Sequence, residues 1–170
     1  PVMLLPNHIS SIDMPIVLRA LPPELRYKVA IATATDSTHE RFPWAIPVLN
    51  FLFNIYPFAR VGQIKSSLDY TGRIIDRGFS IMLFPEGRVS RNAKLQEIKG
   101  GAGFLAVEMG IPIVPVKIIG TNYVYPSGRV FPELPSRHDV TVKFGKPIQF
   151  SEDTSYIQVT RIIENALKEL

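Results

Sequence analysis

The sequence predicts a single α/β domain, a three-layer sandwich in which helices cover both faces of a mixed, mostly parallel sheet. Two observations lead to this fold class. Short apolar runs rich in Val, Ile and Phe alternate along the chain with segments of helical spacing. No internal repeat or linker interrupts the alternation, and 170 residues suffice for one domain with a real core. Alternating β and α units favour parallel strands with helices on both sides.

Six apolar runs bounded by Pro, Gly or Asn are expected to form the strands of this sheet. They are residues 2–5, 29–32, 53–58, 81–84, 113–119 and 140–144. Helical spacing is carried by residues 15–20, 66–76, 101–109 and 156–170. The last helix is the clearest, because its apolar side chains form one stripe and its charged side chains the opposite one.

Glycines gather at 100–103, where the third helix is expected to begin. Free backbone amides at a helix start can hold an anion. Glycines at the same place can instead let a helix pack close to the sheet. We favour the packing interpretation and keep the anion site as the alternative.

The composition excludes several function classes. A net charge of +4 is too small to indicate nucleic-acid binding, although it suits an anionic substrate or an anionic membrane surface. The absence of cysteine excludes disulfides, cysteine nucleophiles and thiolate metal sites. No apolar run reaches the roughly 18 to 20 residues of a membrane-spanning helix. The chain is therefore not expected to cross a bilayer, but it could lie on one.

The chain begins at Pro1, inside a predicted strand and without an initiator Met. We therefore expect residues 1–170 to be one domain excised from a longer chain. Targeting signals and N-terminal anchors would then lie outside this sequence.

Asn7, His8 and Asp13 follow the first predicted strand and supply a candidate base with an acid to orient it. On a regular helix a five-residue offset sets two side chains about 140° apart. Contact therefore requires His8 in a loop and Asp13 near the start of the next helix, where Pro15 also fits. A carboxylate bonded to one ring nitrogen leaves the other free to accept a proton. The alternative is that Asp13 is only an N-cap and His8 a loop residue.

The motif Phe-Pro-Glu-Gly-Arg at 84–88 follows the fourth predicted strand. Ligands of parallel sheets gather at the carboxyl ends of strands, so this turn should share a rim with the histidine. Arg88 can donate two bonds to a phosphate, and Gly87 allows close approach of the backbone. Glu86 could bond a substrate hydroxyl or hold the arginine. The alternative is a surface turn with a local ion pair.

Together, these two motifs resemble the signature of the glycerolipid acyltransferase family, the lysophosphatidate and glycerol-3-phosphate acyltransferases. That signature is Asn-His, four variable residues and Asp, followed later by Phe-Pro-Glu-Gly. In the family the residue after Glu-Gly is usually Thr and the arginine comes next, whereas Arg88 follows Gly87 directly here. Residues 56–60 resemble the second family block, in which an arginine ends a strand, and residues 111–116 resemble the fourth.

The resemblance implies an O-acyltransferase that moves a fatty acyl group from acyl-CoA or acyl-carrier protein to the hydroxyl of a lysophospholipid or glycerol phosphate. By the same resemblance His8 is the general base and Asp13 orients it. No metal and no cofactor is expected, and transfer should be direct, because no residue resembles an acyl-enzyme nucleophile. The residues implied to hold the phosphate end of the acceptor are Arg60, Glu86, Gly87 and Arg88.

Two other functions stay open from the sequence. One is the acyltransferase domain of a bifunctional acyl-carrier-protein synthetase, and the other is a non-catalytic lipid-binding module at a membrane surface. The expected location is the cytoplasmic face of a membrane, with the domain peripheral or anchored by segments outside this chain. The apolar segment 42–53 could contact acyl chains or lipid, and could equally be core.

Overall fold

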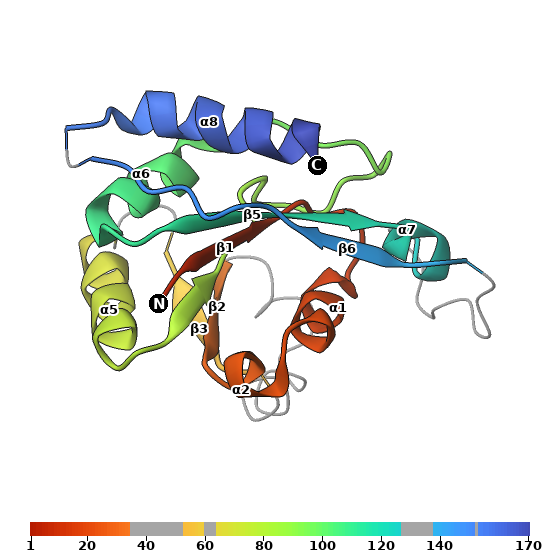
Figure 1. Cartoon of the computed structure of the whole chain (residues 1–170), viewed down its shortest axis with the longest axis horizontal. Helices are drawn as coiled ribbons and strands as arrows, with labels where there is room; N and C mark the ends of the chain where they lie inside the picture. The colour runs from red at the N-terminus through yellow and green to blue at the C-terminus, as the bar shows by residue number, and fades with distance from the viewer. Residues whose placement is uncertain (35–52, 60–63, 127–137, 152) are drawn as a thin grey trace.

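The computed structural model describes residues 1–34, 53–59, 64–126, 138–151 and 153–170. Six strands form one sheet in the order β3-β2-β4-β1-β5-β6 (Figure 1). All neighbours pair in parallel except β5 and β6, which are antiparallel. The predicted mixed, mostly parallel sheet is therefore confirmed. The strands are β1 (Met3–Pro6), β2 (Val29–Ala34), β3 (Ile55–Phe58), β4 (Ser80–Met82), β5 (Ile113–Ile119) and β6 (Thr141–Phe144).

Helices cover both faces of the sheet, as predicted. The layer of α6 and α8 lies on one side in Figure 1, and α1 and α2 lie on the other. The two short helices α2 and α7 were not predicted, because four residues make about one turn and carry no periodic signal. No helix in the described ranges is long and apolar enough to span a membrane. The helices are α1 (Asp13–Ala20), α2 (Pro23–Arg26), α5 (Ile64–Asp76), α6 (Gly100–Met109), α7 (Thr121–Val124) and α8 (Tyr156–Glu169).

Alternation along the central strand β1 divides the core into two layers. Met3 and Leu5 are fully buried in the cluster that also contains Leu105 of α6. Leu4 faces the opposite way and belongs to the cluster that contains Val17 of α1. Full burial of such a side chain stabilises the fold by about 1.5 to 3 kcal/mol. The strand that precedes the candidate base is thus held from both sides.

The glycine-rich start of α6 serves helix–helix packing. A Cβ atom at Gly103 would collide with the Thr160 hydroxyl and the Tyr156 carbonyl of α8, whereas Gly100 and Gly101 face open space. The packing interpretation therefore holds for one glycine, but the close neighbour is α8 and not the sheet. Helices can approach this closely only where no side chain separates their backbones.

The carboxyl ends of three neighbouring strands meet at one rim of the sheet. Met3 of β1 is level with Ile81 of β4 and with Ile113 of β5. The loops that leave β1 and β4 therefore emerge side by side, and β5 extends past them to Ile119. Both sequence motifs lie in these loops.

Candidate active site

His8 and Asp13 are brought together as the spacing requires. His8 lies in the loop after β1, and Asp13 is the first residue of α1. Nδ1 of His8 is 2.9 Å from Oδ2 of Asp13, and their side chains are 17% and 0% exposed. A carboxylate on Nδ1 leaves Nε2 as the ring nitrogen that can take up a proton. The ring nitrogen that Asp13 does not contact is therefore the basic one.

Asp13 is a hydrogen-bond acceptor for the loop, not a helix cap. Its Oδ2 also accepts the backbone N–H groups of Ile9 at 2.6 Å and Ser10 at 2.8 Å. Its Oδ1 accepts the Thr121 hydroxyl at 2.6 Å. The residue in the N-cap position of α1 is Ile12, which makes no side-chain cap. The alternative in which Asp13 only caps the helix does not describe this carboxylate.

Phe84 fixes the His8 ring from its face. The two ring centroids are 4.0 Å apart and the planes differ by 24°, which is a stacked arrangement. Stacking on Phe84 restricts rotation of the imidazole. The ring is thus oriented by a carboxylate at its edge and by an aromatic ring at its face.

Glu86 lies beneath the His8 loop. It is 1% exposed, and its two carboxylate oxygens accept the backbone N–H groups of His8 and Gln96, each at 2.7 Å. Burial raises the pKa of this carboxyl above its ordinary value, and the two amide donors oppose that shift. Each oxygen accepts one backbone N–H, and the side chain thereby holds the backbone of the candidate base. A direct contact of Glu86 with the substrate stays a prediction.

The loop after β4 also holds the other backbone group of His8. The N–H of Ser90 donates to the His8 carbonyl at 2.7 Å. The chain reaches this position through a tight turn at Gly87, whose φ of +69° favours glycine. The N–H and C=O of His8 are thus both bonded to one loop, which explains physically why the two motifs occur together.

Asn7 continues the sheet with its side chain. Its Nδ2 donates to the Ile118 carbonyl at 3.1 Å, and its Oδ1 accepts the Ile118 N–H at 2.6 Å. The side-chain amide thus takes the place of one more peptide unit beside β5. The residue before the candidate base is 2% exposed and pinned to the neighbouring strand.

The other residues implied to hold a phosphate differ in how the structure places them. Arg88 is exposed at the start of the loop that leaves the Glu86 turn. Gly87 forms that turn and is partly exposed. Arg60 lies outside the described residues, as does all of the segment 42–53 except Phe53.

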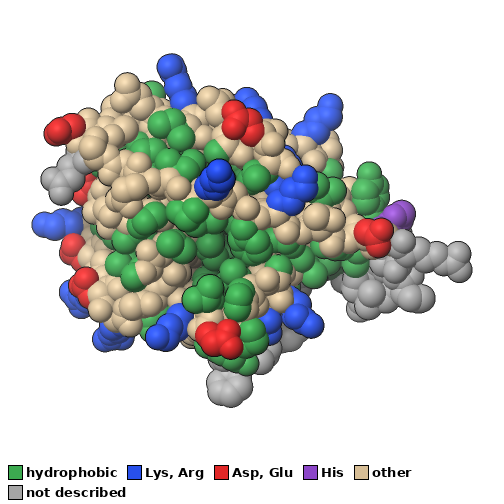
Figure 2. Space-filling model, viewed as in Figure 1, with side chains coloured by type: hydrophobic (Ala, Val, Ile, Leu, Met, Phe, Trp, Pro, Cys, Tyr) green, Lys and Arg blue, Asp and Glu red, His purple; other side chains and the backbone are tan. Residues whose placement is uncertain are grey.

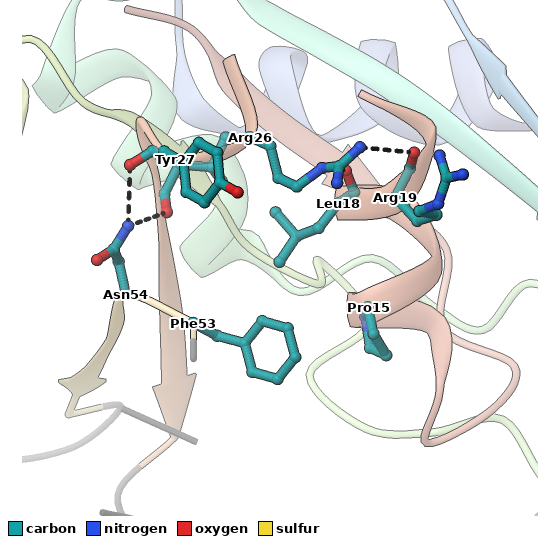
Figure 3. A pocket seen from close by; sticks show the side chains of 8 residues that line it. Pro15, Leu18, Arg19, Arg26, Tyr27, Phe53 and Asn54 are labelled. Atoms are coloured by element: carbon teal, nitrogen blue, oxygen red, sulfur yellow. Dashed lines mark hydrogen bonds between the residues drawn. The ribbon is translucent and has the colours of Figure 1, made fainter. Parts of the chain in front are cut away.

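A separate groove of about 230 Å³ lies between α1, α2 and the starts of β2 and β3 (Figure 3). The Arg26 guanidinium donates to three backbone carbonyls around the end of α1, and the Asn54 amide donates to two near the start of β2. The side chains of Arg26 and Asn54 thus hold neighbouring elements together. No histidine or carboxylate is among its described lining residues. The described lining residues are Pro15, Leu18, Arg19, Arg26, Tyr27, Val29, Phe53 and Asn54.

A histidine–aspartate pair at the carboxyl rim of a parallel sheet defines an α/β protein equipped for general-base chemistry. Within the described ranges no three His, Asp or Glu side chains gather as a metal site. Residues 1–119 match the model of the family described as Acyltransferase. The chain belongs to this family, as the resemblance implied.

Similar proteins carry the name 1-acyl-sn-glycerol-3-phosphate acyltransferase. One from Limnanthes douglasii is 30% identical over 156 residues, which are 87% of this chain and 50% of that protein. A chloroplastic one from Brassica napus is 30% identical over 115 residues, which are 64% of this chain and 33% of that protein. The chain thus spans half or less of the length of these relatives.

A solved structure shows the same fold. The crystal structure of the 1-acyl-sn-glycerophosphate (LPA) acyltransferase PlsC from Thermotoga maritima matches with a TM-score of 0.72 at 22% identity. The match covers 99% of this chain and 64% of the PlsC chain. The α/β architecture of Figure 1 is therefore that of a known acyltransferase.

Proposed function

We propose that this chain transfers a fatty acyl group from an acyl thioester to the free hydroxyl of lysophosphatidate or a closely related lysophospholipid or glycerol phosphate. The observation that carries the proposal is the 2.9 Å contact between His8 Nδ1 and Asp13 Oδ2 at the rim of the sheet. Family membership supplies the reaction class, and the names of the relatives suggest the acceptor.

The transfer is a direct displacement at the thioester carbonyl. Nε2 of His8 takes the proton of the acceptor hydroxyl as its oxygen attacks the carbonyl carbon. A C–O bond forms, the C–S bond breaks, and the proton passes from His8 to the leaving thiolate. Asp13 keeps Nδ1 protonated and stabilises the imidazolium between these steps. A positioned base of this kind contributes about 10²- to 10⁴-fold in rate.

The absence of cysteine from the 170 residues makes the test simple. A thiol reagent added to the chain, a long-chain acyl-CoA and lysophosphatidate will report only released CoA. We expect thiol release that depends on lysophosphatidate and an equal amount of phosphatidate by mass spectrometry. His8→Ala should fold normally and reduce the rate by about 10²-fold or more. Turnover within tenfold of the parent would remove His8 as the base, and lipid binding without turnover in the parent would favour the non-catalytic module.

The proposal also covers the acyl donor and the cellular location of the reaction. Acyl-CoA and acyl-carrier protein present the same thioester, so parallel assays with the two donors distinguish a free-standing enzyme from a domain that works with a carrier protein.

The lysophospholipid acceptor is a lipid, and each methylene that leaves a bilayer costs about 0.8 kcal/mol. We therefore propose that the domain acts at the cytoplasmic face of a membrane, peripherally or anchored by segments outside these residues.

A further inference from the structure

We infer that Thr121 is a positioning residue for the His8–Asp13 pair, a role that rests on the proposed function and extends it to α7. The Thr121 hydroxyl donates to Oδ1 of Asp13 at 2.6 Å, while His8 contacts Oδ2 of the same carboxylate. Thr121 and Asp13 are both fully buried, so water does not compete for this bond. The hydroxyl therefore fixes the carboxylate oxygen that the histidine does not touch.

A second bond ties α7 to the same loop. The Ser10 hydroxyl donates to the Tyr125 carbonyl at 2.7 Å, one residue past the end of α7. Ser10 is fully buried, and its own N–H donates to Asp13. The loop that carries the candidate base is thus attached to α7 at two points.

Gly120 allows the chain to bring Thr121 into this position. Its φ is +94°, and a Cβ atom there would collide with the Asp139 carbonyl beside β6. The chain leaves β5 in a conformation that side chains rarely adopt and enters α7 directly. The backbone conformation of Gly120 thus sets the position from which Thr121 of α7 contacts Asp13.

Rotation of the Asp13 carboxylate would change the hydrogen bond between Asp13 and the His8 ring. Among the described residues, three donors, one of them His8, share Oδ2, and Thr121 donates to Oδ1. Without the hydroxyl, a buried oxygen loses its partner, and the carboxylate can turn away from the imidazole. A carboxylate that has lost the Thr121 hydrogen bond is also more basic. The His–Asp pair should therefore bind its proton more tightly. The chemical step should respond, while binding of the lipid tail should not.

The experiment compares Thr121→Val with Thr121→Ser. Valine keeps the shape and removes the hydroxyl, and serine keeps the hydroxyl. In Thr121→Val we expect kcat to fall by about 10- to 100-fold with little change in either KM. The acidic limb of the profile of kcat against pH should move to higher pH. Thr121→Ser should restore both towards the parent values.

Thr71→Val is the matched control, because Thr71 is also fully buried and its hydroxyl contacts Tyr56 and the Ser67 carbonyl on α5. It should lower the melting temperature and leave the pH profile unchanged. Glu86, the other titratable group that the described residues place beside the pair, is present in every variant.

A readout that needs no activity separates this inference from the proposed function. The His8 ring titration is followed by NMR and assigned through its loss in His8→Ala, since the chain has three histidines. A shifted titration in Thr121→Val, restored in Thr121→Ser, supports the inference even if no acyl transfer is detected. Parent-like titration and kcat in Thr121→Val would overturn it. Failure of Thr121→Val and Thr121→Ala to fold, with Thr121→Ser intact, would make the residue structural and overturn it as well.

Discussion

The two carboxylates of the site, Asp13 and Glu86, are buried with every oxygen hydrogen-bonded. Asp13 and Glu86 are 0% and 1% exposed, and each of their oxygens accepts at least one hydrogen bond. Most of the donors are backbone amides, which have fixed positions once the loops have formed. Within the described residues no buried side-chain nitrogen or oxygen lacks a partner. Acid groups can be buried here because the loops supply donors in advance.

Glu86→Gln tests this arrangement through pH. The amide can accept only one of the two backbone bonds, so activity per folded molecule should fall as the His8 backbone loosens. Burial raises the folded-state pKa of Glu86 above its ordinary value of 4.5. The unfolding free energy of the parent therefore loses a contribution as pH rises from about 4.5 through the folded-state pKa. Glu86→Gln lacks that loss, so its stability deficit should narrow from acid to neutral pH in urea titrations. A deficit that widens over that range would contradict the raised pKa.

Arg88 and Arg60 are proposed to hold the acceptor phosphate. Arg88→Ala and Arg60→Ala should raise the KM for lysophosphatidate by about tenfold or more, because a guanidinium–phosphate pair is a charge-assisted bond. The KM for the thioester should change little. Arg77→Ala is the matched control, since Arg77 is exposed before β4, at the opposite end from Arg88. If the donor KM rises instead, these arginines belong to the CoA or carrier-protein side.

Sequence reasoning predicted the roles of some residues of the site and missed others. The His8–Asp13 contact followed from a short spacing and loop geometry. The role of Glu86 did not, because a motif does not show which way a side chain points. Thr121 was missed, since 108 residues separate it from its partner and a single threonine carries no pattern. Local chemistry could be predicted, whereas its long-range support needed coordinates.

At the scale of elements, Gly103 allows α6 to pack close to α8. Gly103→Ala places a methyl group against Thr160 and the Tyr156 carbonyl, and overpacking of this kind costs about 1 to 3 kcal/mol. We expect a lower melting temperature with activity per folded molecule retained. Gly101→Ala is the matched control on the same helix, because its methyl group meets open space. It should leave stability unchanged or slightly raised, and equal effects of the two variants would contradict the packing argument.

The strands and the four longer helices were predictable because their patterns extend over enough residues. Short apolar runs rich in Val, Ile and Phe marked the strands, and a 3.6-residue period marked α8. The one-turn helices α2 and α7 left no period to detect. Their presence follows instead from the ends of neighbouring elements, such as the left-handed Gly120 after β5.

At the scale of the whole molecule, the formal net charge is +4. On the face shown in Figure 2, acidic side chains are interspersed among the basic ones, and hydrophobic side chains lie between them. A net charge of this size favours a general attraction to anionic surfaces over a site-specific one. Large apolar side chains such as Leu25 and Tyr27 near α2 are 55% and 74% exposed.

We expect weak binding to vesicles that contain anionic lipid and less binding to neutral vesicles. Each basic residue near such a surface contributes about 1 kcal/mol, and the attraction falls off over about 8 Å at physiological salt. Co-sedimentation with vesicles should therefore weaken as salt is raised from low to physiological concentration. Binding that ignores both lipid charge and salt would point to insertion of apolar side chains such as Tyr27.

The hydrogen bonds that hold the site link distant parts of the chain, with separations of 78 residues from His8 to Glu86 and 111 from Asn7 to Ile118. Folds dominated by such pairings form slowly, because each long loop must close before its contacts can stabilise it. On refolding, helical circular dichroism should thus recover before acyl transfer does. The same dependence sets a minimum length for a working chain. A fragment ending before β5 would contain both sequence motifs and still lack the strand that fixes Asn7 and the hydroxyl that holds Asp13.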